Sequence, residues 1–468
     1  MTFMRSCLAP IAGLLLVVPG LAQSTPQQQL AHDVFKQLIE INTTDSVGDN
    51  TKAAEAMAAR FRAAGYPDSD IQVLGPAPRK GNMVVRLHGT GPARPILFIG
   101  HLDVVEAKRS DWSVDPFQFI EKDGYFYGRG TSDMKGDDAI LVTTFLRLKR
   151  EGFHPSRDMI LALTSDEEGG NSNGVDWLVK NHRDSIDAEF CVNSDGGGGV
   201  IKSGTKIFMG VQAAEKVFLS FKLEVTNPGG HSSLPKKDNA IYHLADGLSR
   251  LARFDFPVRL FDVTRDEFER TAALYPGELG SDLKAVVAHP SGANQQDDAG
   301  VIARLSALPL YNALLRTTCV PTMMTAGHAE NALPQSASAV INCRLIPVDD
   351  AENVEATLRH VLADPAINIT VMTPAKISKY IPMNQTVLAA VTSATAKYWP
   401  GLPIVPLMTT GASDGVYLNS KGIPTYGVSG IFGDQDDVRA HGRDERVMVK
   451  SFYDAVDFIY DVATTLGK

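Results

Sequence analysis

Short apolar runs that alternate with amphipathic stretches constrain the fold of this chain more than any other feature of its sequence. Runs with the length and apolar content of buried strands cover residues 82–89, 94–100, 158–165 and 188–194. Stretches with apolar residues at helical spacing cover residues 28–41, 51–66, 137–152 and 174–182. Because strands that alternate with helices form sheets with covered faces, the sequence predicts an α/β fold.

The pattern changes near residue 213. Within residues 216–225 every second side chain from Val217 is apolar, which is typical of an antiparallel strand with one solvated face. The other predicted elements of this module are strands at 337–347 and 367–373 and helices at 239–254 and 351–364. The α/β pattern returns from about residue 381, so we expect a small α+β module inserted into the larger α/β domain.

The length of 468 residues agrees with two domains, because it exceeds what one ordinary core supports. We divide the chain into a first part of the larger domain (23–212), the inserted module (213–374) and a second part of the larger domain (375–468). Residues 255–322 have mixed helical character that this scheme does not assign.

The first 22 residues have the features of a secretory signal peptide. Arg5 precedes a short apolar run, and small residues offer a cleavage site near Ala22. The run is too short for a membrane span, and no other apolar run is long enough to be one. We expect a periplasmic or secreted protein without a stable membrane anchor.

Charge and cysteine usage exclude two classes of protein. The formal net charge of −9 and the lack of a basic stripe argue against a general affinity for nucleic acid. The mature chain would keep Cys191, Cys319 and Cys343, an odd number that makes no disulfide framework. One pair could form, but we expect scattered buried thiols.

Acidic residues and two histidines follow the predicted strands of the larger domain. They are His101 and Asp103 after residues 94–100, Asp133 after a Gly-rich turn, Asp166, Glu167 and Glu168 after residues 158–165, Asp195 after residues 188–194, and His441 near the end. Ligands bind outside the carboxyl ends of strands in open α/β sheets, so we expect these side chains to meet at one sheet edge. Carboxylates with imidazoles suit zinc, cobalt or manganese, and this many carboxylates suit two ions.

His101 and Asp103 lie in the apolar segment 97–105, where each must be desolvated. Alternate residues of an extended segment face the same side, so the Asp103 carboxylate can accept a hydrogen bond from the His101 ring. We therefore interpret His101 as a metal ligand and Asp103 as the residue that orients it.

Five segments resemble, in order, the motifs of the M20 family of metallopeptidases. They are GHLDVV (100–105), YGRGTSDMKG (127–136), TSDEEGG (164–170), NSDGG (193–197) and AHGRDER (440–446). The resemblance covers nearly all of the mature chain. It implies a di-zinc site in a large catalytic α/β domain, with the inserted module as a lid that often also forms a homodimer.

The resemblance also implies a role for each residue of the cluster. Asp133 would bridge two ions, with His101 and Asp195 on one ion and Glu168 and His441 on the other. Glu167 would be the general base that takes a proton from a water shared by the two ions and passes it to the leaving amine. Cobalt or manganese would fit the same ligands.

Lid segments extend the resemblance to substrate contacts. His231, in NPGGHSSLP (227–235), resembles the histidine that helps stabilise the oxyanion. Asn331 and Arg344 stand where the family contacts a substrate carboxylate, which a guanidinium can bind through two hydrogen bonds. Asn342 departs from the Asp that many relatives carry at this position.

The segment TTGASDGVYL (409–418) resembles the Gly-rich substrate loop of the family. This resemblance brings Gly411 and Ser413 near the site. A plain turn is the alternative interpretation for Ser413.

These features predict a metal-dependent hydrolase of amide bonds, and we expect an exopeptidase, either a carboxypeptidase or a dipeptidase. An N-acyl-amino-acid amidohydrolase would use the same residues, and the motifs do not separate the two. The substrate would be a small peptide or an N-acyl amino acid. A non-catalytic binding protein of the same fold is the alternative from another class, and loss of a ligand or of the base would favour it.

Overall fold

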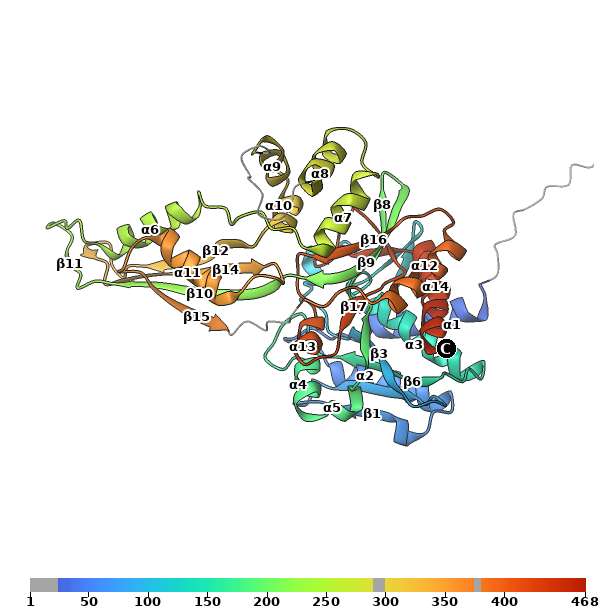
Figure 1. Ribbon diagram of the computed structural model, residues 1–468. Helices are drawn as coiled ribbons and strands as arrows, with labels where there is room; N and C mark the ends of the chain where they lie inside the picture. The colour runs from blue at the N-terminus through green and yellow to red at the C-terminus, as the bar shows by residue number, and fades with distance from the viewer. Residues whose placement is uncertain (1–23, 289–298, 374–379) are drawn as a thin grey trace, which may run out of the picture.

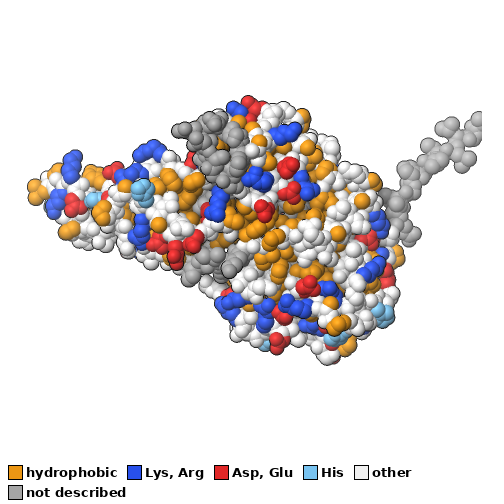
Figure 2. All heavy atoms as spheres, viewed as in Figure 1, with side chains coloured by type: hydrophobic (Ala, Val, Ile, Leu, Met, Phe, Trp, Pro, Cys, Tyr) orange, Lys and Arg blue, Asp and Glu red, His pale blue; other side chains and the backbone are white. Residues whose placement is uncertain are grey.

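This computed structural model describes residues 24–288, 299–373 and 380–468, so the predicted signal peptide lies outside the described residues. A rounded larger body is built from both ends of the chain, and an elongated module from the middle of the chain projects from one side of it (Figures 1 and 2). The structure is mixed α/β, as predicted. Among the described residues, no helix combines the length and the apolar character needed to cross a bilayer.

One large mixed sheet organises the larger body. Its ten strands are β1 (Ile71–Leu74), β2 (Asn82–Leu87), β3 (Ala93–His101), β6 (Arg157–Thr164), β7 (Phe190–Asn193), β8 (Gly198–Lys202), β9 (Thr205–Glu215), β16 (Ile404–Thr409), β17 (Thr425–Gly427) and β18 (Phe432–Asp434). The strand order is β1-β2-β6-β3-β7-β17-β9-β8-β18, and β16 also pairs with β9. Strand β3 runs parallel to both β6 and β7, so the carboxyl ends of these three strands meet at one edge.

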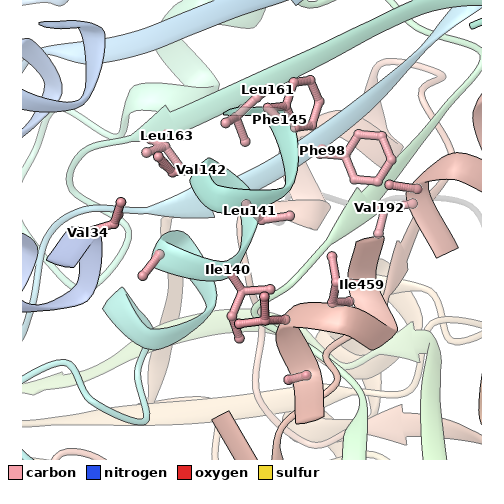
Figure 3. Packing of buried hydrophobic residues seen from close by; sticks show 14 of the residues in the cluster. Val34, Phe98, Ile140, Leu141, Val142, Phe145, Leu161, Leu163, Val192 and Ile459 are labelled. Atoms are coloured by element: carbon pink, nitrogen blue, oxygen red, sulfur yellow. The ribbon is translucent and has the colours of Figure 1, made fainter. Parts of the chain in front are cut away.

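Helices cover both faces of this sheet. They are α1 (Pro26–Ile39), α2 (Asn50–Ala63), α3 (Lys135–Arg150), α4 (Gly174–Asn181), α5 (Arg183–Ile186), α12 (Gln385–Tyr398), α13 (Gly415–Ser420) and α14 (Val449–Gly467). Successive residues of β3 point into hydrophobic clusters on opposite faces of the sheet. Phe98 packs in the cluster with α3 and α14, and Leu97 packs in the cluster with α4 and α13. Figure 3 shows Phe98 near Phe145 of α3 and Val192 of β7. A small sheet of β4 (Ile120–Lys122), β5 (Tyr125–Tyr127) and β19 (Arg446–Met448) lies beside them.

The projecting module, which we call the lid, is a four-stranded antiparallel sheet with two helices. Its strands, in sheet order, are β12 (Thr318–Ala326), β14 (Ser336–Leu345), β10 (Val217–Thr226) and β15 (Asn368–Thr373), and its helices are α6 (Ala240–Leu251) and α11 (Ala351–Leu362). A short ladder of β11 (Gly230–His231) and β13 (Ala332–Leu333) lies at the end of the lid that is farthest from the larger body (Figure 1). The predicted alternation holds in β10, where Leu219, Phe221 and Leu223 are buried and Phe218 is exposed.

The segment 255–322, which the sequence left unassigned, contains four helices. They are α7 (Asp262–Ala272), α8 (Glu278–Ala288), α9 (Ala299–Ser306) and α10 (Pro309–Leu315). These helices share a hydrophobic cluster with Ala213 of β9 and Met408 of β16, so they pack against the larger body where the chain enters the lid.

The expectation of scattered unpaired thiols is wrong for two of the three cysteines. Cys319 and Cys343 form a disulfide, and Cys191 is a buried free thiol. The antiparallel register of β12 and β14 places residue 319 directly opposite residue 343. The spacing of the cysteines along the chain does not reveal this register, which depends on tertiary pairing.

Candidate metal centre

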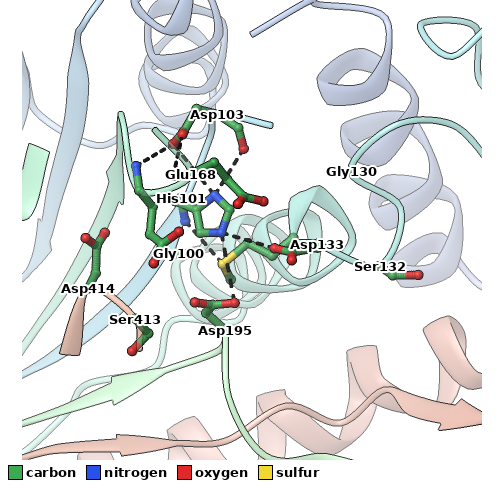
Figure 4. A network of polar contacts seen from close by, with 12 residues as sticks. Gly100, His101, Asp103, Gly130, Ser132, Asp133, Glu168, Asp195, Ser413 and Asp414 are labelled. Atoms are coloured by element: carbon green, nitrogen blue, oxygen red, sulfur yellow. Dashed lines mark hydrogen bonds and ion pairs between the residues drawn. The ribbon is translucent and has the colours of Figure 1, made fainter. Parts of the chain in front are cut away.

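The predicted acidic cluster forms at the carboxyl ends of β3, β6 and β7. His101 is the last residue of β3, Glu167 and Glu168 follow β6, and Asp195 follows β7. Asp133 comes from the loop before α3. In Figure 4 the His101 ring lies between Asp103 on one side and Asp133 and Asp195 on the other. Thus segments that are far apart in the sequence converge because their strands are neighbours in the sheet.

Two groups of ligand atoms share Asp133. In the first group, His101 Nε2 lies 3.2 Å from Asp133 Oδ1 and 3.9 Å from Asp195 Oδ1. In the second group, His441 Nε2 lies 3.0 Å from Asp133 Oδ2 and 2.8 Å from Glu168 Oε1. Within each group the ligand atoms all lie within 4.8 Å of one another. This is the arrangement expected of two cation sites joined by one carboxylate.

The chemistry of these groups fits divalent cations. His101 Nδ1 lies 3.0 Å from the backbone carbonyl oxygen of Asp103, so a hydrogen bond there leaves the Nε2 lone pair facing the carboxylates. Asp133 Oδ1 is buried and has no hydrogen-bond partner among the described residues. A cation between these atoms would offset the repulsion between the neighbouring carboxylates and would give Asp133 Oδ1 a partner. Oxygen and nitrogen ligands without thiolate suit zinc, cobalt or manganese.

Burial and neighbouring carboxylates raise the pKa values of the glutamates in the cluster. Burial raises the pKa of Glu167 to about 10, and the carboxylates of Asp414 and Asp195 add to this shift while His101 opposes it. Burial also raises the pKa of Glu168 to about 7. The hydrogen bond to Asp133 raises the pKa of His441 to about 9. Protons therefore balance the carboxylates when no cation does.

Asp103 acts through a different contact from the predicted one. Its carboxylate oxygen Oδ1 lies 3.7 Å from His101 Nδ1, whereas its backbone carbonyl makes the 3.0 Å contact with the ring. The carboxylate instead accepts the backbone N–H of Glu167 at 3.1 Å and that of Glu168 at 2.9 Å. Asp103 thus fixes both the His101 ring and the turn that carries the two glutamates.

Glu445 is a buried residue of the site to which the sequence assigned no role. Its carboxylate accepts the backbone N–H groups of Gly130, Ser132 and Asp133 at 3.1, 2.7 and 3.0 Å. Arg129 pairs with it at 2.5 Å. Glu445 thereby sets the loop that presents Asp133. It lies in the AHGRDER segment, and its place in that segment is the sequence signal that could have identified it.

A hollow of about 390 Å³ adjoins the cluster on the lid side. Glu167, Glu168, Arg344 and Ser413 all line it. The Arg344 guanidinium lies over the Phe218 ring, with Cζ 4.8 Å from the ring centroid. Burial lowers the pKa of Arg344, and among the described residues no carboxylate forms an ion pair with it. The hollow therefore offers an unpaired guanidinium beside the acidic cluster.

The Ser413 hydroxyl is fully engaged in hydrogen bonds with neighbouring side chains. It donates to Glu215 Oε2 at 2.8 Å and accepts from the Asn193 side chain at 3.1 Å. Residues 411–415 also match the G-x-S-x-G pattern of serine hydrolases, in which a histidine activates the serine. A glutamate takes that place here, so the contacts favour a structural role for Ser413. Gly411 lies in the turn after β16.

His231 and Asn331 lie together at the far end of the lid and are exposed. The backbone N–H of Ser232 donates to the Asn331 carbonyl at 3.2 Å, and His231 Nδ1 accepts the backbone N–H of Ser233 at 3.1 Å. Figure 1 shows β11 well away from β3, the strand that ends at His101. The structure does not bring these two predicted residues to the acidic cluster of the same chain.

Comparison with known families agrees with this geometry. Residues 97–465 match the family model described as Peptidase family M20/M25/M40. The chain belongs to this family. It is thus a metallopeptidase or metallo-amidohydrolase of the M20 type, as the motifs predicted.

Relatives of this M20 protein have names that describe different activities. It is 30% identical over 390 residues to "Probable carboxypeptidase S-like 2" of Dictyostelium discoideum, covering 80% of this chain and 72% of that protein. It is 26% identical over 388 residues to "N-fatty-acyl-amino acid synthase/hydrolase PM20D1" of Homo sapiens, covering 80% and 75%. An M20 family metallo-carboxypeptidase from Sulfolobus solfataricus has the same fold, with a TM-score of 0.69, 18% identity, and coverage of 93% of this chain and 99% of that one.

Proposed function

We propose that this M20 protein hydrolyses the amide bond between an acyl or peptidyl group and an amino acid that carries a free carboxylate. The observation that carries this proposal is the unpaired Arg344 guanidinium in the same hollow as Glu167 and Glu168. A guanidinium binds a carboxylate through two charge-assisted hydrogen bonds. The amino-acid end of a substrate would therefore be held beside the acidic cluster.

Two divalent ions, which we propose to be zinc, would be held by the two groups of ligands. His101 and Asp195 would hold one ion, Glu168 and His441 the other, and Asp133 would bridge them. Such ions lower the pKa of a water molecule and polarise a carbonyl oxygen. Asp103 and Glu445 would keep the ligands in place through the hydrogen bonds described above.

Glu167 is the proposed general base. Among the described residues Glu167 belongs to neither group of ligand atoms, and it lines the hollow next to Glu168. Its carboxylate would take a proton from water and deliver the proton to the leaving nitrogen. This role requires Glu167 to be ionised, and cations in the cluster would favour that state.

His231 would donate a hydrogen bond to the oxyanion. Its place at the far end of the lid supports a contribution from a second copy of the chain, so we propose a homodimer formed through the lid. Asn331, its neighbour, would contact the substrate from the same side.

The two candidate activities differ in the group on the other side of the scissile amide. The carboxypeptidase-like relative supports a peptide, and the N-fatty-acyl-amino acid hydrolase supports an N-acyl amino acid. Val217, Val416 and Tyr417 also line the hollow that holds Arg344, so an apolar amino acid fits both alternatives.

We also propose that the protein is exported. The predicted signal peptide and the Cys319–Cys343 disulfide both support an oxidising compartment.

Metal content measured together with activity tests the proposed function. Purified protein should carry about two ions per chain, and it should cleave N-acetyl-phenylalanine, phenylalanyl-phenylalanine or both. A chelator should abolish cleavage, and zinc, cobalt or manganese should restore it. A metal-loaded protein that cleaves neither these compounds nor their leucine analogues would refute the proposal.

A further inference from the structure

A second hollow, of about 380 Å³, borders the cluster on the side of Asp195. The glycine segment 196–199 forms part of its wall, and its apolar side chains include Val200, Leu407, Ile431 and Met448. Gly199 packs tightly, because a Cβ there would lie 2.2 Å from the Phe432 ring. The acidic cluster thus adjoins two hollows, one with Glu167 and Arg344 and one with Asp195.

Both arginines of the second hollow pair with Asp437, whereas Asp137, Asp195 and Asp434 line it without a Lys or Arg partner among the described residues. Asp437 accepts hydrogen bonds from Arg439 at 2.6 Å and from Arg446 at 2.6 Å. Arg446 also lies over the Tyr125 ring, with Cζ 3.9 Å from the ring centroid. Asp137 accepts a hydrogen bond from the Ser429 hydroxyl at 2.7 Å. With both arginines paired, the apolar side chains of the wall are the surface that the hollow offers to an apolar group.

Two further features of this hollow suit an elongated ligand. Val438 lines the hollow with 77% of its surface exposed, so its apolar side chain is free to contact a bound chain. The Ser194 hydroxyl, which lines the hollow next to Asp195, is 3% exposed and has no hydrogen-bond partner among the described residues. An apolar wall with a polar group near the cluster matches a molecule with an apolar tail and a polar end.

We propose that this second hollow binds the acyl group of the substrate, and that the acyl group is an unbranched aliphatic chain. The inference rests on the proposed function, because it requires the scissile amide to lie at the cluster with the amino acid toward Arg344. The acyl chain then extends past Asp195 along residues 196–199 toward Val438. The substrates are then N-acyl amino acids.

The test compares N-acetyl-, N-hexanoyl- and N-decanoyl-phenylalanine on the metal-loaded, full-length mature protein. Burying one methylene contributes roughly 0.8 kcal/mol, or about fourfold in kcat/KM for each methylene that enters the hollow. We expect kcat/KM to rise at least about tenfold from the acetyl to the hexanoyl compound. Binding of decanoate, measured by calorimetry, gives a readout that does not depend on turnover.

Variants locate the effect. Val438→Asp places a charge at the exposed side of the hollow and should lower the hexanoyl-to-acetyl ratio of kcat/KM at least about fivefold, with weaker decanoate binding. Val47→Asp is the matched control, because Val47 is 73% exposed and does not line the hollow. Gly433→Leu is a second variant, because Gly433 lines the hollow and no atom lies within 4 Å of the position that a Cβ would take, so the larger side chain can be accommodated.

The outcomes separate this inference from the proposed function. A chain-length preference that Val438→Asp and Gly433→Leu both reduce, and Val47→Asp leaves intact, supports the inference. Hydrolysis without any chain-length preference, or a preference that both variants leave unchanged, overturns the inference but leaves the proposed function standing. Failure to cleave every N-acyl amino acid and dipeptide overturns the proposed function and the inference with it.

Discussion

The carboxylate of Asp103 accepts the backbone N–H of Glu167, with an oxygen–nitrogen distance of 3.1 Å. Its other oxygen holds the next N–H along the chain, that of Glu168. One buried side chain therefore positions both the proposed base and a proposed metal ligand. Because the ring of His101 is oriented by a backbone carbonyl, removal of the Asp103 carboxylate should disturb the glutamate turn more than the histidine.

This relationship predicts the behaviour of Asp103→Asn. The amide keeps one acceptor oxygen but turns an NH₂ group toward a backbone N–H, so kcat should fall roughly 10- to 100-fold. Metal content at saturating zinc should stay near two ions per chain. The matched control is Asp45→Asn, an acid whose side chain is 58% exposed and paired with Lys80. A kcat within twofold of the wild-type value would contradict the assigned role.

The adjacent glutamates should respond differently to the same substitution. Glu167→Gln should lower kcat roughly 10²- to 10⁴-fold and keep both ions, because only the proton acceptor is lost. Glu168→Gln should lower metal content toward one ion per chain, because a ligand of the second group is lost. Metal analysis of each purified variant separates the two effects. Near-normal hydrolysis by the metal-loaded Glu167→Gln protein would remove Glu167 from the role of base.

The hydrophobic patterns of the sequence were sufficient to predict the site residues that directly follow a strand. The apolar runs that became β3, β6 and β7 are parallel neighbours, so the residues that follow them meet without any further information. The alternation in β10 also survives, because one face of the lid sheet is buried and the other is not. Period and position along a strand were sufficient for these features.

Features that depend on register or on backbone groups were not predictable in this way. The Cys319–Cys343 disulfide needs the register of β12 on β14, and the orienting contact of His101 uses a carbonyl that every residue possesses. Segment 255–322 remained unassigned because its helices pack against β16, which comes far later in the chain. His231 matched a motif, but its distance from the cluster depends on how the lid projects.

Glu267 on α7 provides a pH-dependent test of the packing of this segment. Its carboxylate accepts the backbone N–H of Met408 at 3.0 Å, and burial raises its pKa to about 8. The unfolded chain releases this proton near pH 4.5. Between these two pH values the folded state binds more protons than the unfolded state, so stability should fall as the pH rises.

Glu267→Gln removes this ionisation and keeps an oxygen for the Met408 N–H. On metal-free protein the melting temperature of the variant relative to wild type should therefore increase from pH 5 to pH 8, with a stability difference growing by roughly 2–4 kcal/mol. Glu269→Gln changes an exposed acid on the same helix and should show no such trend. A difference between Glu267→Gln and wild type that stays constant over this range would contradict the buried, protonated state of Glu267.

The position of His231 predicts complementation between two inactive variants. If His231 acts on the site of a second chain, a His231→Ala chain paired with a Glu167→Gln chain contains one complete site. Each variant alone should be at least about 100-fold less active than wild type, since each loses a group that acts in the transition state. After subunit exchange, random pairing should restore about a quarter of wild-type activity.

A mixture of His231→Ala with His231→Gln is the matched control and should stay inactive. Activity of the first mixture that equals the mean of its parents, together with an active monomer in sedimentation, would show that His231 does not act across a dimer.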